Sequence, residues 1–228
     1  MTLHSDQLAR DLLAWWDEHG RHDIPWKQVD SAGQLDPYGI WVAEVMLQQT
    51  QLQVALPYWQ RWMETFPALE VLAEAEEQEV LLCWQGLGYY SRARRLHGSA
   101  RQLLKRIGAN ASDDPQCWPR ELEAWLALPG IGFSTAGGIL SSAFNIPVAI
   151  LDGNVRRVLA RFQAHPRPPM RAQSLFWSWS EALLDPIRSR DVNQALMDLG
   201  ATLCTPRTPN CAACPWRLHC AAYASGDP

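Results

Sequence analysis

The chain has 228 residues, of which 47% are hydrophobic and only 19% are charged. This balance excludes an intrinsically disordered chain, and the length suits one large globular domain or two smaller ones folded together. The formal net charge is −4, from 20 basic and 24 acidic side chains. An acidic total by itself argues against a nucleic-acid-binding protein, although net charge does not tell where the charges lie.

The hydrophobic pattern is helical along almost the whole sequence. We expect a first helix between Ser5 and Gly20, and further helices at 40–56, 58–65, 74–84, 92–107, 120–128, 134–144, 154–162, 172–184 and 191–203. The connections are short and marked by Pro or Gly, and no alternating run is long enough for a sheet. The sequence therefore predicts an all-α fold, whose 12 tryptophans mostly fill the core.

The sequence predicts neither a secretory signal nor a membrane span. Residues 1–11 lack the basic start and the small-residue cleavage site of a signal peptide. The uncharged stretch 126–151 contains prolines, glycines and hydroxyl residues, which favour a buried segment over a lipid-facing helix. We expect a cytoplasmic protein that works without a membrane.

Four of the six cysteines fall in the last 25 residues, with the spacing C-x6-C-x2-C-x5-C. They are Cys204, Cys211, Cys214 and Cys220. Four-cysteine sites hold Zn²⁺ or an iron–sulfur cluster. Zinc sites more often contain two C-x2-C pairs, so the single pair and the wider loops here favour a cubane cluster. Cys83 and Cys117 stand apart and are expected to be ordinary packing residues.

A Gly- and Pro-rich turn separates two predicted helices at Leu128-Pro129-Gly130-Ile131-Gly132. The amide hydrogens at the start of the helix after such a turn attract a phosphate oxygen. A simple turn between antiparallel helices would explain the same residues equally well.

Two acidic residues stand in unusual surroundings. Glu44 is flanked by apolar residues in W-V-A-E-V-M-L-Q-Q-T, where burial would raise its pKa and suit it to general-acid catalysis. It could equally lie on the exposed stripe of an amphipathic helix. Asp152 precedes the helix that contains Asn154, where it could cap the helix or present a carboxylate to a sugar.

Aromatic and basic residues occur together in two regions. Tyr89 and Tyr90 precede an Arg-rich helix at 92–106, and a second group of arginines lies at 156–171. Flat rings beside cations suit stacking on bases, and arginines suit a surface that follows phosphates. Core tyrosines and a solvated helix face are the simpler alternatives.

These motifs, in this order, resemble the helix–hairpin–helix glycosylase superfamily, and within it the MutY-type adenine DNA glycosylases. The matching stretches are residues 37–51, 86–94, 128–139, 150–161 and 193–201, together with the four cysteines. The resemblance implies a six-helix domain at 32–145 and an iron–sulfur cluster domain formed by 1–31 and 146–228. It also implies an enzyme of base excision repair that hydrolyses the N-glycosidic bond of adenine mispaired with 8-oxoguanine or guanine.

The resemblance assigns roles to individual residues. Glu44 would protonate the adenine, and Asp152 would stabilise the oxocarbenium-like sugar, as paired carboxylates do on glycosidic bonds generally. Asn154 would orient the site and Ser134 would lie at the reacting sugar. The expected DNA-contacting residues are Gln49 and Tyr89, which wedge into the duplex, Gly130 and Gly132 at a phosphate, and Gln194 at the flipped base. The cysteines would hold a [4Fe–4S] cluster, and the protein would bind mispaired or oxidised double-stranded DNA as a monomer, at the nucleoid.

Ser134 also separates this chain from endonuclease III-like enzymes, which carry a lysine at that position of the hairpin. The only lysines here are Lys27 and Lys105, so we expect a glycosylase without strong lyase activity. Phe133 and Lys27 depart from the usual residues, and the sequence printed ends before the domain that reads 8-oxoguanine in this family. Two alternatives stay open: a glycosylase acting on thymine or uracil opposite guanine, and a non-catalytic lesion-binding module. Glu44 favours adenine, because the thymine and uracil enzymes lack it.

Overall fold

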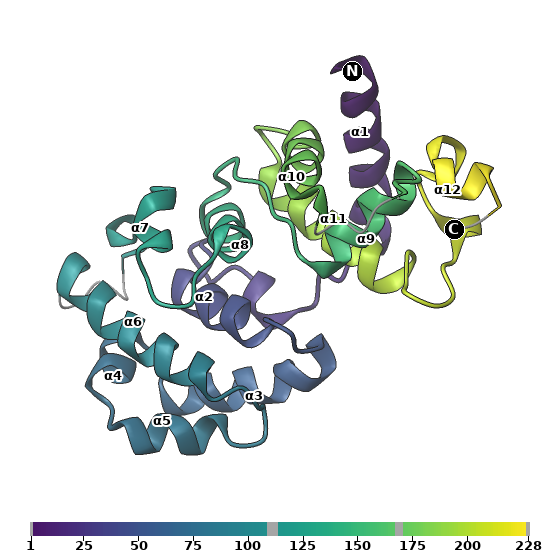
Figure 1. Ribbon diagram of the computed structural model, residues 1–228. Coiled ribbons are helices and arrows are strands. Elements are labelled where there is room, and N and C mark those ends of the chain that lie inside the picture. Colours follow the sequence, from purple (N-terminus) through teal and green to yellow (C-terminus); the bar gives the residue numbers. More distant parts are fainter. Residues whose placement is uncertain (1, 109–113, 167–170, 227–228) are drawn as a thin grey trace. The chain divides into compact units, whose positions relative to one another are not determined.

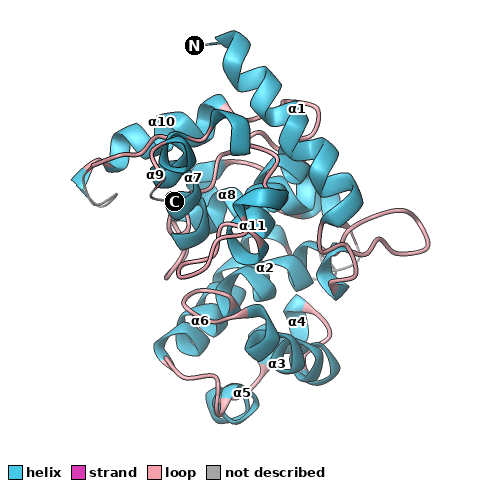
Figure 2. Ribbon diagram, turned by 90° about the vertical axis from the view of Figure 1, so that its right-hand side faces the viewer, coloured by secondary structure: helices cyan, strands magenta, loops and turns pink. Residues whose placement is uncertain are grey.

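The computed structural model describes residues 2–108, 114–166 and 171–226. Within these ranges every regular element is helical, which confirms the predicted all-α fold (Figure 2). The chain forms two compact units, one from Ile24–Ile139 and one from Met1–Asp23 together with Leu140–Pro228. No helix among the described residues has both the length and the apolar character needed to span a lipid bilayer.

The unit formed by Ile24–Ile139 is built around helix α6. Its elements are η1 (Pro25–Lys27), α2 (Pro37–Met46), α3 (Leu52–Thr65), α4 (Leu69–Glu74), α5 (Glu77–Trp84), α6 (Ser91–Ile107), η3 (Pro115–Cys117), α7 (Leu122–Leu126) and the start of α8 (Phe133–Phe144). Helix α6 packs against α2, α4 and α5, and α3 packs against α2 and α5 (Figure 1). Tryptophans fill much of this core, as the sequence predicts: Trp41, Trp62, Trp84, Trp118 and Trp125 are almost fully buried.

Helix α2 lies in the middle of this unit. Asp36 caps its first turn by accepting hydrogen bonds from the amides of Tyr38 and Gly39, both at 2.9 Å. Pro37 occupies the first helical position, where its missing N–H costs nothing. Nine of the ten residues of α2 are buried and the tenth, Glu44, is half-buried. The helix therefore belongs to the core, and Glu44 is its one side chain at the edge of that core.

The other unit is built around α9 (Gly153–Phe162) and α11 (Ser189–Thr202), which pack against each other. Helix α1 (Thr2–His19) packs on α11, and α10 (Gln173–Ala182) and α12 (Ala221–Ala224) pack on α9. The end of α8 and the single turns η5 (Cys211–Ala213) and η6 (Arg217–His219) complete the unit. The buried Asp198 of α11 accepts hydrogen bonds from Trp16 Nε1 at 3.0 Å and Arg21 Nε at 2.6 Å, which secures α1.

Two of the predicted helices were too long. The expected helix 40–56 ends at Met46 because Gln49 has a left-handed backbone (φ 57°), and a new helix starts at Leu52 and runs on through Pro57. The expected helix 74–84 is interrupted where Glu76 and Glu79 form a reciprocal capping box that starts α5. Both breaks depend on turn chemistry, which hydrophobic periodicity does not report.

The units differ in their bounds from the predicted division at 31/32 and 145/146. The η1 turn packs on α2, and the Trp26 ring lies 5.3 Å from the Trp59 ring, so residues 24–31 join the α2 unit. At the other boundary, Asn193 Nδ2 on α11 donates to Ser141 Oγ at 2.9 Å. This bond fixes the last part of α8 to the unit that holds the chain ends.

Candidate active site

Glu44 of α2 lies against Gly138 of α8. A Cβ built on Gly138 would stand 2.5 Å from Glu44 Oε2 and 2.7 Å from its Cδ. These distances are shorter than any ordinary contact, so only glycine at position 138 leaves room for the carboxylate where it is. The simpler interpretation of Glu44, a place on the exposed stripe of an amphipathic helix, is wrong, because the rest of α2 is buried.

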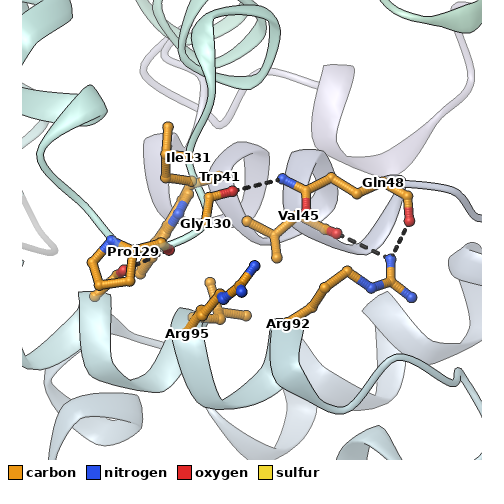
Figure 3. A pocket seen from close by; sticks show the side chains of 10 residues that line it. Trp41, Val45, Gln48, Arg92, Arg95, Pro129, Gly130 and Ile131 are labelled. Carbon is orange, nitrogen blue, oxygen red and sulfur yellow. Dashed lines mark hydrogen bonds between the residues drawn. The ribbon is translucent and has the colours of Figure 1, made fainter.

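The predicted Gly/Pro turn at 128–132 immediately precedes α8, and Gln48 donates hydrogen bonds to both. Gln48 Nε2, just after the end of α2, donates to the carbonyl of Gly130 at 3.2 Å (Figure 3). It also donates to Thr135 Oγ1 at 3.1 Å. Gly130 has a φ of 83°, which a side chain would strain. Both Gly130 and Gly132 are exposed, so a phosphate has access to this turn.

Ser134 stands two residues after Gly132, in the first turn of α8, and is half-buried. It precedes Gly138 by four positions, so both residues lie on the same face of α8, the face that meets Glu44. Phe133 beside it is 61% exposed. One side of α8 therefore carries Ser134 and also Gly138, the residue that contacts Glu44 of α2.

In the second unit, Asp152 is the N-cap of α9. Its Oδ1 accepts a hydrogen bond from the amide of Val155 at 2.7 Å, and its Oδ2 accepts one from Asn154 Nδ2 at 3.2 Å. Burial raises the pKa of Asp152, and these hydrogen bonds oppose that rise. Asp152 thus caps α9, as one of the two sequence interpretations predicts. The cap uses only part of the hydrogen-bonding capacity of its carboxylate, so a functional role stays open to it.

A chain of hydrogen bonds joins this carboxylate to the cysteine loop. Asn154 Oδ1 accepts from Arg157 Nη2 at 2.8 Å, and Arg157 also donates to the carbonyls of Gly200 at 2.7 Å and Cys204 at 2.8 Å. A Cβ on Gly200 would lie 2.7 Å from Asn154 Cβ, so α11 meets the start of α9 almost backbone to backbone. Asp152 is therefore held through Asn154 and Arg157 to the segment that begins at Cys204.

The four cysteines of the predicted cluster surround one cavity. Cys204, Cys211, Cys214 and Cys220 all line it, all are half-buried, and none is in a disulfide. Arg161 Nη1 donates to Cys204 Sγ at 3.5 Å. In the described part of the chain, no group of three or more His, Cys, Asp or Glu side chains is placed to hold a single metal ion. Four sulfurs spread around a cavity are a donor set that fits a polynuclear cluster.

Gln49 and Tyr89, the predicted wedge residues, share two properties. Both are exposed, Tyr89 by 64%, and both have a left-handed backbone although neither is glycine, with φ of 57° and 49°. Gln49 lies between α2 and α3, and Tyr89 lies just before α6. Left-handed non-glycine residues at exposed tips are strained, and such strain is concentrated at functional sites.

Gln194, expected to contact a flipped base, is a buried residue of α11. It is 7% exposed, and its Nε2 donates to Ser142 Oγ at 2.9 Å. Its role as a base contact stays a prediction.

Several arginines of the two basic groups are hydrogen-bonded within the protein. Arg92, Arg101, Arg156, Arg157 and Arg161 all donate to backbone carbonyls. Arg92 is buried and does not contribute to the expected phosphate-following surface. Arg101 is exposed and Arg156, Arg157 and Arg161 are half-buried, so for these four that surface stays a prediction. Arg167 lies outside the described residues. Cys83 is buried, as expected, but Cys117 is exposed and its thiol lies 3.7 Å from Asp114 Oδ2, so its assignment as a packing residue is wrong.

Sequence reasoning missed the residues that support the predicted ones. These are Gln48, Gly138, Arg157 and Gly200. Gly138 and Gly200 left a signal, because a glycine inside a predicted helix costs stability and calls for a packing reason.

Comparison with known proteins places this arrangement in a family. The family model of the helix–hairpin–helix (HhH-GPD) superfamily of base excision DNA repair proteins matches residues 42–182. The chain belongs to this superfamily. The matched range includes Glu44, the hairpin turn and Asp152.

Relatives of this base excision repair superfamily are similar over most of the chain. An adenine DNA glycosylase of Rattus norvegicus is 44% identical over 222 residues, which are 95% of this chain and 42% of that protein. The chain thus spans less than half the length of this curated relative. Among solved structures, a thermostable thymine-DNA glycosylase is similar with a TM-score of 0.81 and 26% identity, covering 98% of this chain and 99% of the other. A non-covalent endonuclease III–DNA complex, 16% identical with a TM-score of 0.76 over 99% and 98% of the two chains, has the same fold.

Proposed function

We propose that this protein is a DNA glycosylase that removes adenine mispaired with 8-oxoguanine or guanine. The observation that carries the proposal is Glu44, a carboxylate on an otherwise buried helix, held against the one glycine that leaves room for it. The 44% identity to an adenine DNA glycosylase supports the choice of adenine. Glu44 protonates the base and so makes it a leaving group.

Asp152 supplies the second carboxylate, as hydrolysis of a glycosidic bond requires. An ionised carboxylate stabilises the positive charge that develops on the sugar as the base departs. Asn154 donates to Asp152 and so keeps the carboxylate ionised and oriented. Ser134 lies at the reacting sugar in this proposal.

The DNA contacts follow from the exposed parts of the described surface. Gly130 and Gly132 bind a phosphate at the start of α8, where the helix dipole favours negative charge. Gln49 and Tyr89 enter the duplex and occupy the space of the extruded nucleotide. Gln194 contacts the extruded base if its bond to Ser142 exchanges on binding.

We further propose that the reaction stops at base removal. Ser134 has no amine with which to form a Schiff base, and the two lysines of the chain lie in η1 and near the end of α6. Borohydride should therefore trap no covalent enzyme–DNA adduct in good yield. A high yield would contradict this part of the proposal.

The four cysteines are proposed to hold a [4Fe–4S] cluster, which supplies a rigid link between the ends of the loop that they share. Purified protein should contain iron and acid-labile sulfide in about equal amounts, as a cubane requires. One equivalent of zinc without sulfide would contradict the cluster and support the single-ion alternative.

A thymine or uracil glycosylase is the second candidate, because a thymine-DNA glycosylase is among the most similar structures. One experiment separates the candidates: single-turnover cleavage, developed with alkali, of duplexes that pair adenine with 8-oxoguanine, adenine with guanine, and thymine or uracil with guanine. We expect strand breaks at adenine in the first two. Breaks at thymine or uracil alone would support the second candidate, and none in any duplex would support a lesion-binding module.

A further inference from the structure

Arg92 is the second residue of α6 and is only 6% exposed. Its guanidinium reaches under the end of α2, toward the carbonyls of Val45 and Gln48 (Figure 3). A buried arginine needs several acceptors, because guanidinium carries five N–H groups and is costly to desolvate. Where its hydrogen bonds go therefore decides what it does.

One group of bonds fixes the segment around Gln49. Arg92 Nη1 donates to the carbonyls of Val45 at 3.2 Å, Met46 at 2.8 Å and Gln48, and Nη2 donates to Thr50 Oγ1 at 3.1 Å. The first two carbonyls belong to the last turn of α2, where a cation is favourable. The partners on Gln48 and Thr50 lie on either side of Gln49 and hold both ends of the left-handed residue.

A second group of contacts fixes the segment that ends in Tyr89. Arg92 Nη2 faces the carbonyls of Leu87 at 3.5 Å and Gly88 at 3.4 Å. The guanidinium carbon also lies 5.5 Å from the centre of the Tyr89 ring, within the range of a cation–π contact. The same side chain therefore contacts the two segments whose exposed ends, or tips, are Gln49 and Tyr89.

Neither tip is held by sequence preference alone. A left-handed backbone costs a residue other than glycine roughly 1–2 kcal/mol, and both Gln49 and Tyr89 adopt it while exposed to solvent. Such conformations persist only where neighbouring contacts over-determine them. Arg92 supplies contacts of this kind to both segments at once.

We propose that Arg92 is a positioning residue that holds Gln49 and Tyr89 as one rigid pair, so that both enter the DNA duplex together. This rests on the proposed function, in which these two residues replace an extruded nucleotide. In this role Arg92 contacts neither a phosphate nor a base. The phosphate contact expected from its place in an Arg-rich helix is not part of the proposal.

The test separates base extrusion from DNA binding. A duplex with 2-aminopurine opposite guanine brightens when that base leaves the stack, and a duplex with a tetrahydrofuran abasic analogue opposite guanine has no base to extrude. Arg92→Lys keeps the charge and loses the fork, and Arg92→Met loses both. We expect each variant to slow the brightening by about ten-fold or more, because a displaced residue no longer meets the duplex in the geometry that extrusion needs. Affinity for the abasic duplex should change by less than about three-fold, since the phosphate contacts remain.

Arg61→Met is the matched control. Arg61 lies in the same unit, donates to the carbonyl of Cys83 at 2.6 Å and covers the ring of Tyr58 at 4.8 Å. Its loss removes a guanidinium that bonds to a carbonyl and covers a tyrosine ring, at a place without a predicted DNA role, so both readouts should stay at the wild-type level. Thermal unfolding of all variants shows whether each is folded, and Arg92→Lys decides the matter if Arg92→Met is not.

Two results would overturn the proposal. One is unchanged brightening in folded Arg92→Lys. The other is an equal loss of extrusion and of binding to the abasic duplex, which indicates a general structural role. Neither readout requires bond cleavage, so a wild-type protein that extrudes 2-aminopurine but cleaves no adenine contradicts the proposed chemistry and not the role of Arg92.

Discussion

The carboxylate of Glu44 occupies the space that a side chain on Gly138 would fill, with Oε2 only 2.5 Å from the Cβ position. The two residues are on different helices, α2 and α8, and α8 begins at the hairpin turn. The position of Glu44, the proposed general acid, thus depends on residue 138 being a glycine. Gly138 lies on the helix that follows the predicted phosphate site.

Gly138→Ala is therefore expected to reduce excision without unfolding the protein. The atoms that the new methyl group meets are the far end of a flexible side chain, so Glu44 can move away at little cost in stability. A displacement of about 1 Å at a catalytic group lowers the rate by about 100-fold. Single-turnover excision and thermal unfolding measure the two effects.

Gly98→Ala is the control for this change. Gly98 lies inside α6 with no atom within 4 Å of its Cβ position. Alanine should stabilise that helix by about 0.5–1 kcal/mol and leave excision unchanged. If Gly138→Ala keeps the full excision rate, the contact with Gly138 does not set the place of Glu44.

Asp152→Asn should abolish excision and raise thermal stability at neutral pH. Burial raises the pKa of Asp152 above its ordinary value of 3.8, so the folded state binds this proton more tightly than the unfolded state. The stability from the protonated carboxyl is present below the ordinary pKa and declines as the pH rises through the raised one. Asparagine has no charge to bury and still caps α9.

The gain in stability of Asp152→Asn should therefore be largest at neutral pH and shrink as the pH falls through the raised pKa, since the wild-type carboxyl then becomes protonated as well. Thermal unfolding of both proteins across a series of pH values from neutral to acidic checks the sign. A wild-type protein more stable than Asp152→Asn at neutral pH would show that hydrogen bonds to the ionised carboxylate outweigh its burial.

Asn154→Ala tests the same group through the pH profile. Asn154 donates to Asp152 and lowers its pKa, so its loss should raise that pKa further. If excision needs ionised Asp152, the acid limb of the single-turnover rate then moves to higher pH in the variant. A lower rate at every pH with an unmoved acid limb would show that Asn154 does not act through this carboxylate.

Arg157→Met should loosen the cysteine loop. The change leaves the carbonyls of Gly200 and Cys204 without their donor, and an unsatisfied buried acceptor costs about 1–3 kcal/mol. We expect lower thermal stability and faster loss of iron on dialysis against a chelator. Arg156→Met is the control, because the guanidinium of Arg156 donates to the carbonyl of Leu151 and not to the cysteine loop. This variant should keep its iron. Equal retention in both variants would contradict the role of Arg157.

Sequence patterns could locate the parts of the site that depend on spacing. Three of these patterns lie within short stretches of sequence: the four cysteines, the Gly/Pro turn and the apolar surroundings of Glu44. In the structure the cysteines line one cavity, and Glu44 is the half-buried residue of an otherwise buried helix. The residues that support them could not be found in this way. Arg92 and Arg94 are two positions apart in one basic stretch, yet one is buried among carbonyls and the other pairs with Glu77 at the surface. Which arginine turns inward is decided by acceptors elsewhere in the chain.

The most direct test of the account is single-turnover excision by Glu44→Gln on a duplex with adenine opposite 8-oxoguanine. Glutamine keeps the size of the side chain beside Gly138 and cannot donate a proton as an acid does. The account predicts that excision at neutral pH falls below detection while binding to the same duplex stays at the wild-type level. Excision at a rate near that of the wild type would contradict the assignment of Glu44 as the general acid, and with it the proposed chemistry.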